Sequence, residues 1–294
     1  PSRLRALDAR LFALMSVVRP SEAVAAGAEL IEAADRAGDV HLATRGRINT
    51  ASALNYLGQY AEAQALLDRA LPDTRSFRLR ILEASSLHNL GMSYARQGNL
   101  DHGIELQREA ARIADECGGA RLGINCRIYE ATMLVWRGAP GDMRHANALA
   151  NHVMEATRTQ LGLQVIALFC QARVQYTRRL LEDAVEAARE AYRRIDDGPV
   201  EEWDEQIRLV LVESLLALGL NGEADQVLQA AHDVICARAA QIHKAEYQLS
   251  YTTRNSAELF SGFTLARLSE SVAAAKSRAR RSRSSASLLE SHSP

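Results

Sequence analysis

The sequence lacks the motifs on which most nucleotide-using and hydrolytic enzymes depend. Neither of its two lysines follows a glycine, so there is no Gly-Lys-Ser/Thr phosphate-binding loop. The kinase motifs His-Arg-Asp and Asp-Phe-Gly, the Gly-x-Ser-x-Gly elbow and the zinc motif His-Glu-x-x-His are also missing. We therefore predict a protein that catalyses nothing and needs no cofactor.

Cysteines are few and dispersed, and long apolar runs are missing. No two of the four cysteines form a Cys-x-x-Cys pair, so neither a zinc site nor a disulfide framework is indicated. His145 and His152 stand seven positions apart and match no common metal-site spacing, so we predict no bound metal. Because no segment approaches the roughly 18 apolar residues of a membrane helix and no signal pattern opens the chain, we expect a cytoplasmic location and no membrane partner.

Charge of one sign does not dominate the chain. Its 35 basic and 36 acidic residues leave a net charge of -1, which gives no general attraction to nucleic acid. The exception is 271–294, a basic, Ser/Arg-rich segment that we predict to be a disordered tail. Nucleic-acid binding through this tail is the weakest of our functional hypotheses, because the segment lacks interleaved aromatic residues and a folded platform.

What the sequence does contain is a repeat of about forty residues. A small residue recurs at that interval within similar helical segments, at Ala23, Ala63, Gly103, Ala146, Ala184 and Ala224. Such periodicity is typical of a solenoid, in which each unit buries its apolar face only by stacking on its neighbours. We predict that these residues lie where two helices cross, because a larger side chain would force the backbones apart.

Apolar residues spaced three and four apart predict helices, and strand alternation is absent. The predicted fold class is all-α, a right-handed α-solenoid of about six antiparallel helix pairs over 1–240, followed by a closing helix or helices within 241–270. The predicted pairs are 2–17 with 21–37, 41–57 with 60–71, 77–97 with 100–117, 121–137 with 142–159, 161–178 with 181–195, and 202–218 with 221–238.

Glycine and proline punctuate these helices. We predict a left-handed cap at the end of a first helix at Gly58, Gly98, Gly138 and Gly219. Arg179 stands at the corresponding position of another pair, and we expect a less regular turn there. Pro20 and Pro72 are predicted to lie between helices, where a missing N–H costs little.

One segment of the sequence resembles the motif of a known family. The run Leu90-Gly91, Tyr94, Gly98, Leu100, Gly103 and Ala110 resembles the tetratricopeptide repeat, with its Leu-Gly pair, aromatic residue, turn glycine and small residue in the second helix. The resemblance covers about residues 1–240 and is best around Ala63 and Gly103. A unit of about 40 residues, against roughly 34 in the family, is similar to the arrays at the carboxyl end of bacterial signalling ATPases and serine/threonine kinases.

The resemblance implies a scaffold that binds a protein or peptide in a concave groove lined by the first helix of each pair. Asn49 and Asn89 occupy the same repeat position and are predicted to present two amides to a peptide backbone. The full set of predicted groove residues is Arg45, Asn49, Ser52, His88, Asn89, Met92, Arg96, Thr132, Arg173, Tyr176, Gln206 and Glu213.

A second hypothesis follows from the same resemblance. The chain is then an effector-sensing regulatory segment, covalently linked to an upstream kinase or ATPase domain whose activity it biases through the stacking of its repeats.

The acidic run 201–205 could also attract a cation or a basic peptide. We favour a simpler interpretation, in which its carboxylates stabilise the amino end of a helix.

Overall fold

The computed structural model describes residues 2–17, 19–158, 161–195 and 203–259, which fold entirely into helices and the turns that join them. The predicted all-α class is thus confirmed. Within these residues none of the helices is both long and apolar enough to cross a bilayer. The helices are α1 (Ser2–Ser16), α2 (Pro20–Ala37), α3 (Val40–Tyr56), α4 (Tyr60–Ser76), α5 (Arg80–Arg96), α6 (Leu100–Glu116), α7 (Ala120–Arg137), α8 (Asp142–Ala156), α9 (Leu161–Thr177), α10 (Leu181–Arg193), α11 (Asp204–Ala217), α12 (Asn221–Ala240) and α13 (Ala245–Leu259).

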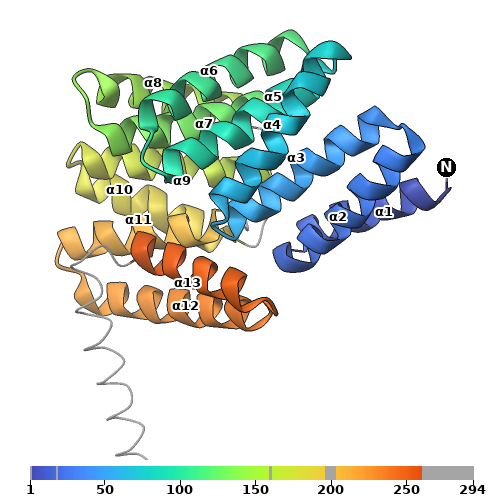
Figure 1. The fold of residues 1–294 in the computed structure, drawn as a ribbon. Coiled ribbons are helices and arrows are strands. Elements are labelled where there is room, and N and C mark those ends of the chain that lie inside the picture. Colours follow the sequence, from blue (N-terminus) through green and yellow to red (C-terminus); the bar gives the residue numbers. More distant parts are fainter. Residues whose placement is uncertain (1, 18, 159–160, 196–202, 260–294) are drawn as a thin grey trace, which may run out of the picture.

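The helices form an α-solenoid with two layers. Each helix packs against the next along the chain, and the odd-numbered helices from α1 to α11 also pack against one another in order. They therefore form the inner layer, and the even-numbered helices lie outside it (Figure 1). Among the described residues the last helix is α13, which packs against both α11 and α12 and extends the inner layer beyond the sixth pair.

The small residues lie at helix crossings, as the repeat predicts. Ala23, Ala63, Ala146 and Ala184 are completely buried. The closest crossing joins α5 to α6, where a Cβ atom built on Gly103 would lie 2.9 Å from the carbonyl oxygen of Gly91. Two helical backbones can approach this closely only where neither carries a side chain, so the repeat position is set by packing.

Left-handed residues end the helices at a regular interval. From Gly38 to Gly138, a residue with positive φ occurs every twenty positions, at 38, 58, 78, 98, 118 and 138. The predicted glycine caps are confirmed. The expectation of a less regular turn at Arg179 is wrong, because Arg179 adopts φ of 63° and its turn has the same backbone hydrogen bonds as the turn at Gly219. Helix stacking therefore determines the geometry of the turn, and Arg179 adopts the left-handed conformation that this geometry requires.

Pro72 also differs from prediction, because it lies inside α4 and not between helices. The missing N–H leaves the carbonyl of Asp68 without its helical donor, but both residues are exposed, so water can replace the donor. The last turn is held by contacts beyond the proline. Asp73 accepts a hydrogen bond from Arg47, and the Thr74 hydroxyl donates to the carbonyl of Leu71.

Candidate binding groove

The inner layer encloses an open groove of about 870 Å³ near the carboxyl ends of α5 and α7. We call it the central groove. Of the twelve residues predicted from sequence, the structure brings four together on its walls, and they come from α5, α9 and α11. These four are Arg96, Arg173, Gln206 and Glu213. The turn between α3 and α4, Trp136 of α7 and one face of α13 complete the lining.

Arg173 and Glu213 form an ion pair on one wall of the groove. They stand forty positions apart, at the same repeat position of α9 and α11, so the pair joins two neighbouring repeats. Arg173 is only 8% exposed, and its Nε is a buried donor without a hydrogen-bond partner in the structure. The phenol of Tyr176, on the next turn of α9, is half-buried, and this burial raises its pKa. The wall therefore holds a charged pair that is largely removed from water.

Arg96 and Trp136 form a second, more exposed pair in the lining of the groove. The guanidinium carbon of Arg96 lies 4.7 Å from the centre of the Trp136 ring, in a cation–π arrangement. Trp136 is nevertheless 37% exposed, which is high for so large an apolar side chain within an inner layer. The pair therefore places a guanidinium beside a partly exposed aromatic face on the lining of the groove.

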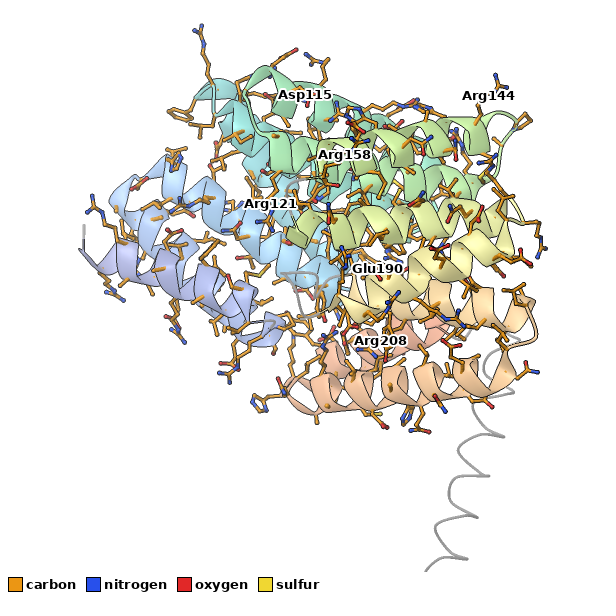
Figure 2. The ribbon with its side chains drawn as sticks, turned by 180° about the vertical axis from the view of Figure 1, so that it is seen from behind. Asp115, Arg121, Arg144, Arg158, Glu190 and Arg208 are labelled. Carbon is orange, nitrogen blue, oxygen red and sulfur yellow. The ribbon has the colours of Figure 1, made fainter. Side chains whose placement is uncertain are left out.

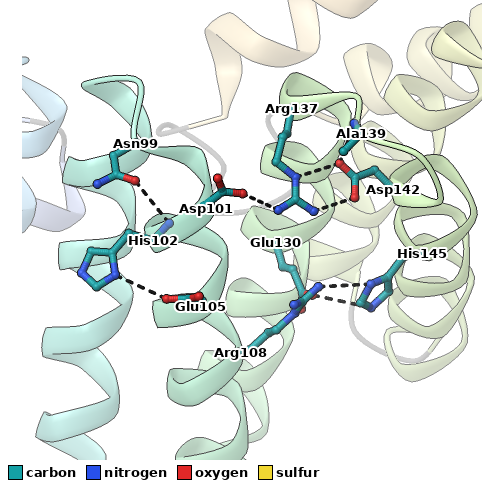
Figure 3. Close-up of polar contacts among 10 residues, drawn as sticks. All are labelled: Asn99, Asp101, His102, Glu105, Arg108, Glu130, Arg137, Ala139, Asp142 and His145. Carbon is teal, nitrogen blue, oxygen red and sulfur yellow. Dashed lines mark hydrogen bonds and ion pairs between the residues drawn. The ribbon is translucent and has the colours of Figure 1, made fainter.

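Arg137, the residue next to Trp136, is held by a polar network that links α6, α7 and α8 (Figure 3). Arg137 binds Asp142 of α8 through two hydrogen bonds of 2.6 and 2.9 Å, and Asp101 of α6 through one of 2.6 Å. These bonds raise the pKa of Arg137 and lower that of the Asp142 carboxyl. A second link in the same region joins Arg108 to Glu130 at 2.6 Å. The network holds the end of α7, and with it the groove wall, in a defined position.

Helix α13 presents one of its faces to the groove. Glu246, Leu249, Ser250 and Thr253 line it, and their spacing of three, four and seven residues places them on a single stripe of the helix. Leu249 is 68% exposed. Within the predicted closing segment at 241–270, α13 therefore forms a wall of the central groove. The predicted tail at 271–294 lies outside the described residues.

Several other predicted residues lie on the inner layer but outside the central groove. Arg45 forms an ion pair with Asp8 of α1, so it connects the first two pairs of helices. Asn49 and Ser52 are half-buried on α3, and Met92 packs against the apolar core from α5. These residues therefore lie nearer the amino end of the array and do not line the central groove.

Three predicted residues lie beneath the surface. His88 is buried, and its Nδ1 lies 2.8 Å from Oε1 of Gln107. Burial lowers the pKa of His88, so the imidazole is neutral. The Asn89 side chain donates to the carbonyl of Ser85, and the buried Thr132 hydroxyl donates to that of Ile128. These polar groups are satisfied within the fold.

Sequence reasoning missed Trp136, although the repeat contains a signal for it. Tyr56, Arg96, Trp136 and Tyr176 follow one another at intervals of forty residues, near the ends of α3, α5, α7 and α9. Trp136 occupies the position of Arg96 in the next repeat, so the repeat register identifies it as a groove residue.

Sequence reasoning also missed the role of the acidic run. Asp204 and Glu205 are buried, and they accept hydrogen bonds from Arg208 and Arg238. Viewed from behind, Arg208 lies within the helical stack, whereas Arg144 projects from its edge (Figure 2). The two carboxylates therefore do more than complement a helix dipole in solvent.

Comparison with known proteins agrees with this architecture. The family model described as "Tetratricopeptide repeat" matches residues 84–114, which include most of α5 and α6. The match supports a repeat of the tetratricopeptide type in this part of the chain, in agreement with its turn glycines and small crossing residues. No curated protein gives a significant match.

Two solved structures have a similar fold. One is BtubC (BKLC) from P. vanneervenii, with 16% identity and a TM-score of 0.55 over 74% of this chain and 91% of that one. The other is a Rap protein complexed with competence and sporulation factor, with 13% identity and a TM-score of 0.58 over 89% of this chain and 74% of that one. At these identities the similarity is one of fold.

Proposed function

We propose that this protein is a scaffold that binds a segment of a partner protein in the central groove. The observation that carries the proposal is the convergence of Arg96, Trp136, Arg173, Gln206 and Glu213 from four inner helices onto one open groove. The fold supports it, since a tetratricopeptide-type array is an interaction scaffold, and one similar structure is a Rap protein complexed with competence and sporulation factor.

The chemistry of the lining defines what this site can recognise. The Arg96 guanidinium and the Gln206 amide each carry more than one N–H donor, so either can bond a backbone carbonyl or a carboxylate alongside its contacts within the fold. Each such hydrogen bond contributes on the order of 1 kcal/mol, or up to about 3 with a charged group. Trp136 and Leu209 supply apolar surface. The two arginines of the lining are balanced by Glu213 and Glu246, so the groove does not select for a strongly charged partner.

Site-directed crosslinking tests the location of binding. A photoreactive amino acid at position 136 should crosslink a defined segment of a partner, whereas the same group at the exposed Arg112 of α6 should not. The affinity of that segment, measured by isothermal titration calorimetry, should fall at least tenfold in the double variant Arg96→Ala, Trp136→Ala. Arg112→Ala is the matched control. Equal affinities for the two variants would remove the groove from consideration.

The surface nearer the amino end has its own test. If a partner extends beyond the central groove along α3 and α5, the double variant Asn49→Ala, Asn89→Ala should lose at least tenfold in affinity with folding intact by circular dichroism. The amide of Asn89 is already bonded to Ser85, so a partner has to displace that intrahelical bond. Normal binding by this variant would confine recognition to the central groove.

A further inference from the structure

Helix α13 is attached to the array through a buried carboxylate. The Glu205 side chain is in α11 and is 2% exposed. Its Oε1 accepts hydrogen bonds from Tyr251 of α13 at 2.9 Å, from Arg238 of α12 at 2.8 Å and from Tyr56 of α3 at 3.4 Å. We call these four residues the clasp. One carboxylate oxygen thus joins four helices, including two residues that stand 149 positions apart.

The clasp is a polar cluster with charge balance. An isolated buried carboxylate is strongly unfavourable, and the guanidinium of Arg238 provides the opposite charge. The same guanidinium lies 2.8 Å from Asp204, so it is shared between two acids. Burial raises the pKa of Tyr251, so its phenol stays protonated and acts as a donor. Loss of Arg238 would leave the Glu205 charge without compensation, and loss of either tyrosine hydroxyl would remove a hydrogen bond from the buried carboxylate.

Two further contacts hold the same face of α13. The rings of Tyr56 and Tyr251 stack with centroids 5.6 Å apart. The hydroxyl of Tyr247 donates to Glu62 of α4 at 3.3 Å. Since Tyr247 and Tyr251 lie one turn apart, they face the array together, and the stripe with Leu249 faces the groove. The clasp therefore fixes which side of α13 lines the groove.

We propose that the clasp positions α13 as a recognition wall, and that the partner segment is an amphipathic helix packed along α13 between Leu249 and Trp136. This inference rests on the proposed function and adds to it the kind of partner and the residues that complete the site. The side chain that contacts the partner is Leu249, and the clasp residues are positioning residues that act through it.

Three observations favour a helix of balanced charge as the occupant. The walls of the groove are helices, and helices pack by placing side-chain ridges between those of a neighbour. The exposed stripe of α13 offers its side chains at helical spacing, with Leu249 as the apolar member. The lining carries two arginines and two glutamates, so it complements a segment with interspersed charges of both signs rather than an acidic or a basic tail.

Selection of peptides tests the kind of partner. A phage-displayed library of 20-residue peptides is selected on the immobilised full chain, and the selected peptides serve as probes in fluorescence anisotropy. We expect apolar residues spaced three, four and seven apart, a net charge near zero, and a loss of at least tenfold in affinity when a proline is placed in the centre of the peptide. Selected peptides that are uniformly acidic or tolerate the proline overturn the helical partner.

Two matched substitutions test the wall. Leu249→Ala should weaken the selected peptides at least tenfold, whereas Leu220→Ala, which truncates another exposed leucine at the start of α12, should leave their affinity unchanged. If these two variants bind alike while Trp136→Ala loses affinity, α13 is not a recognition wall but the proposed function stands. If Trp136→Ala also binds normally, the proposed function fails as well.

A double-mutant cycle tests the clasp. Tyr251→Phe keeps the ring and removes the donor, and we expect a loss in affinity of about threefold to tenfold together with faster amide exchange in α13. Tyr94→Phe is the matched control. Because the clasp acts through Leu249, the combined variant Leu249→Ala, Tyr251→Phe should bind no more weakly than Leu249→Ala alone. Additive losses overturn the positioning role, as does unchanged affinity of Tyr251→Phe.

Discussion

The middle and the end of this array are held together by opposite means. Helices α5 and α6 approach so closely at Gly91 and Gly103 that neither backbone has room for a side chain. Helix α13 instead depends on the clasp, in which Glu205 binds hydroxyl and guanidinium donors. A close backbone crossing excludes solvent and allows only one arrangement of the two helices. The hydrogen bonds of the clasp, in contrast, can be replaced by hydrogen bonds to water. The difference indicates a rigid centre with a closing helix that can be released locally.

The largest effect should come from adding one methyl group in the middle. In Gly103→Ala the new Cβ would meet the Gly91 carbonyl oxygen at 2.9 Å and the Ala95 Cβ at 3.0 Å. The helices must separate, and we expect a loss of about 1 to 3 kcal/mol in the free energy of unfolding, measured with urea.

Gly222 of α12 provides the matched control for that substitution. Nothing lies within 4 Å of its added Cβ, so Gly222→Ala should have no effect or stabilise by up to about 1 kcal/mol through helix propensity. Equal effects of the two substitutions would show that the close crossing does not limit the fold.

The corresponding change at the end is Glu205→Gln. It keeps the shape but removes the charge that Arg238 and Tyr251 bind, so bonds to a charged group worth about 1.5 to 3 kcal/mol are weakened. We expect amide exchange to accelerate in α13 while α5 and α6 remain protected, as measured by hydrogen–deuterium exchange with mass spectrometry. Uniform acceleration across the array would contradict a locally released end.

How much of this contrast could be predicted from the sequence depends on whether a feature repeats. The crossings and turn glycines recur every twenty or forty residues, so Ala63, Gly103 and Gly98 could be placed before the structure was known. The clasp occurs once and joins Tyr56 to Glu205 across the superhelix, so no period marks it. The same limit explains Pro72, whose place within α4 depends on exposure and not on a motif.

Among the groove residues predicted from the repeat, some line the central groove and others are buried. Arg173 and Glu213 are related by the repeat and were predicted as groove residues, and both line the central groove. His88 and Asn89 were predicted from the same register, but the structure buries them. The pattern of a helix identifies its inner side, and only the separation of neighbouring helices decides whether a side chain on that side reaches the groove.

His88 makes the rigid middle sensitive to pH. Burial holds the pKa of His88 in the folded chain below its ordinary value of 6.5, so as the pH falls the unfolded chain binds a proton before the folded chain does. The contribution to stability is complete above about pH 6.5 and is lost as the pH falls toward the lower folded pKa, with a slope of up to about 1.4 kcal/mol per pH unit.

Urea denaturation between pH 7.5 and 5.5 checks this slope. His88→Asn should abolish it even though this variant is less stable throughout, and substitution of the exposed His152 by Asn should retain it. A slope that persists without His88 would assign the pH dependence to other groups.

The smallest effect compares the two turns that flank α5. The turn before it has Arg78 at φ of 53°, and the turn after it has Gly98 at φ of 90°. A left-handed conformation costs an L-residue about 1 to 2 kcal/mol, and glycine avoids this cost but loses about 0.5 to 1 kcal/mol more in chain entropy. Arg78→Gly and Arg179→Gly should each stabilise by up to about 1 kcal/mol, since both arginines are exposed. Gly98→Ala should destabilise by a similar amount. The midpoint of urea unfolding should shift without a change in its slope. If Arg78→Gly lowers the midpoint, the arginine side chain stabilises its turn by more than the strain that its backbone conformation costs.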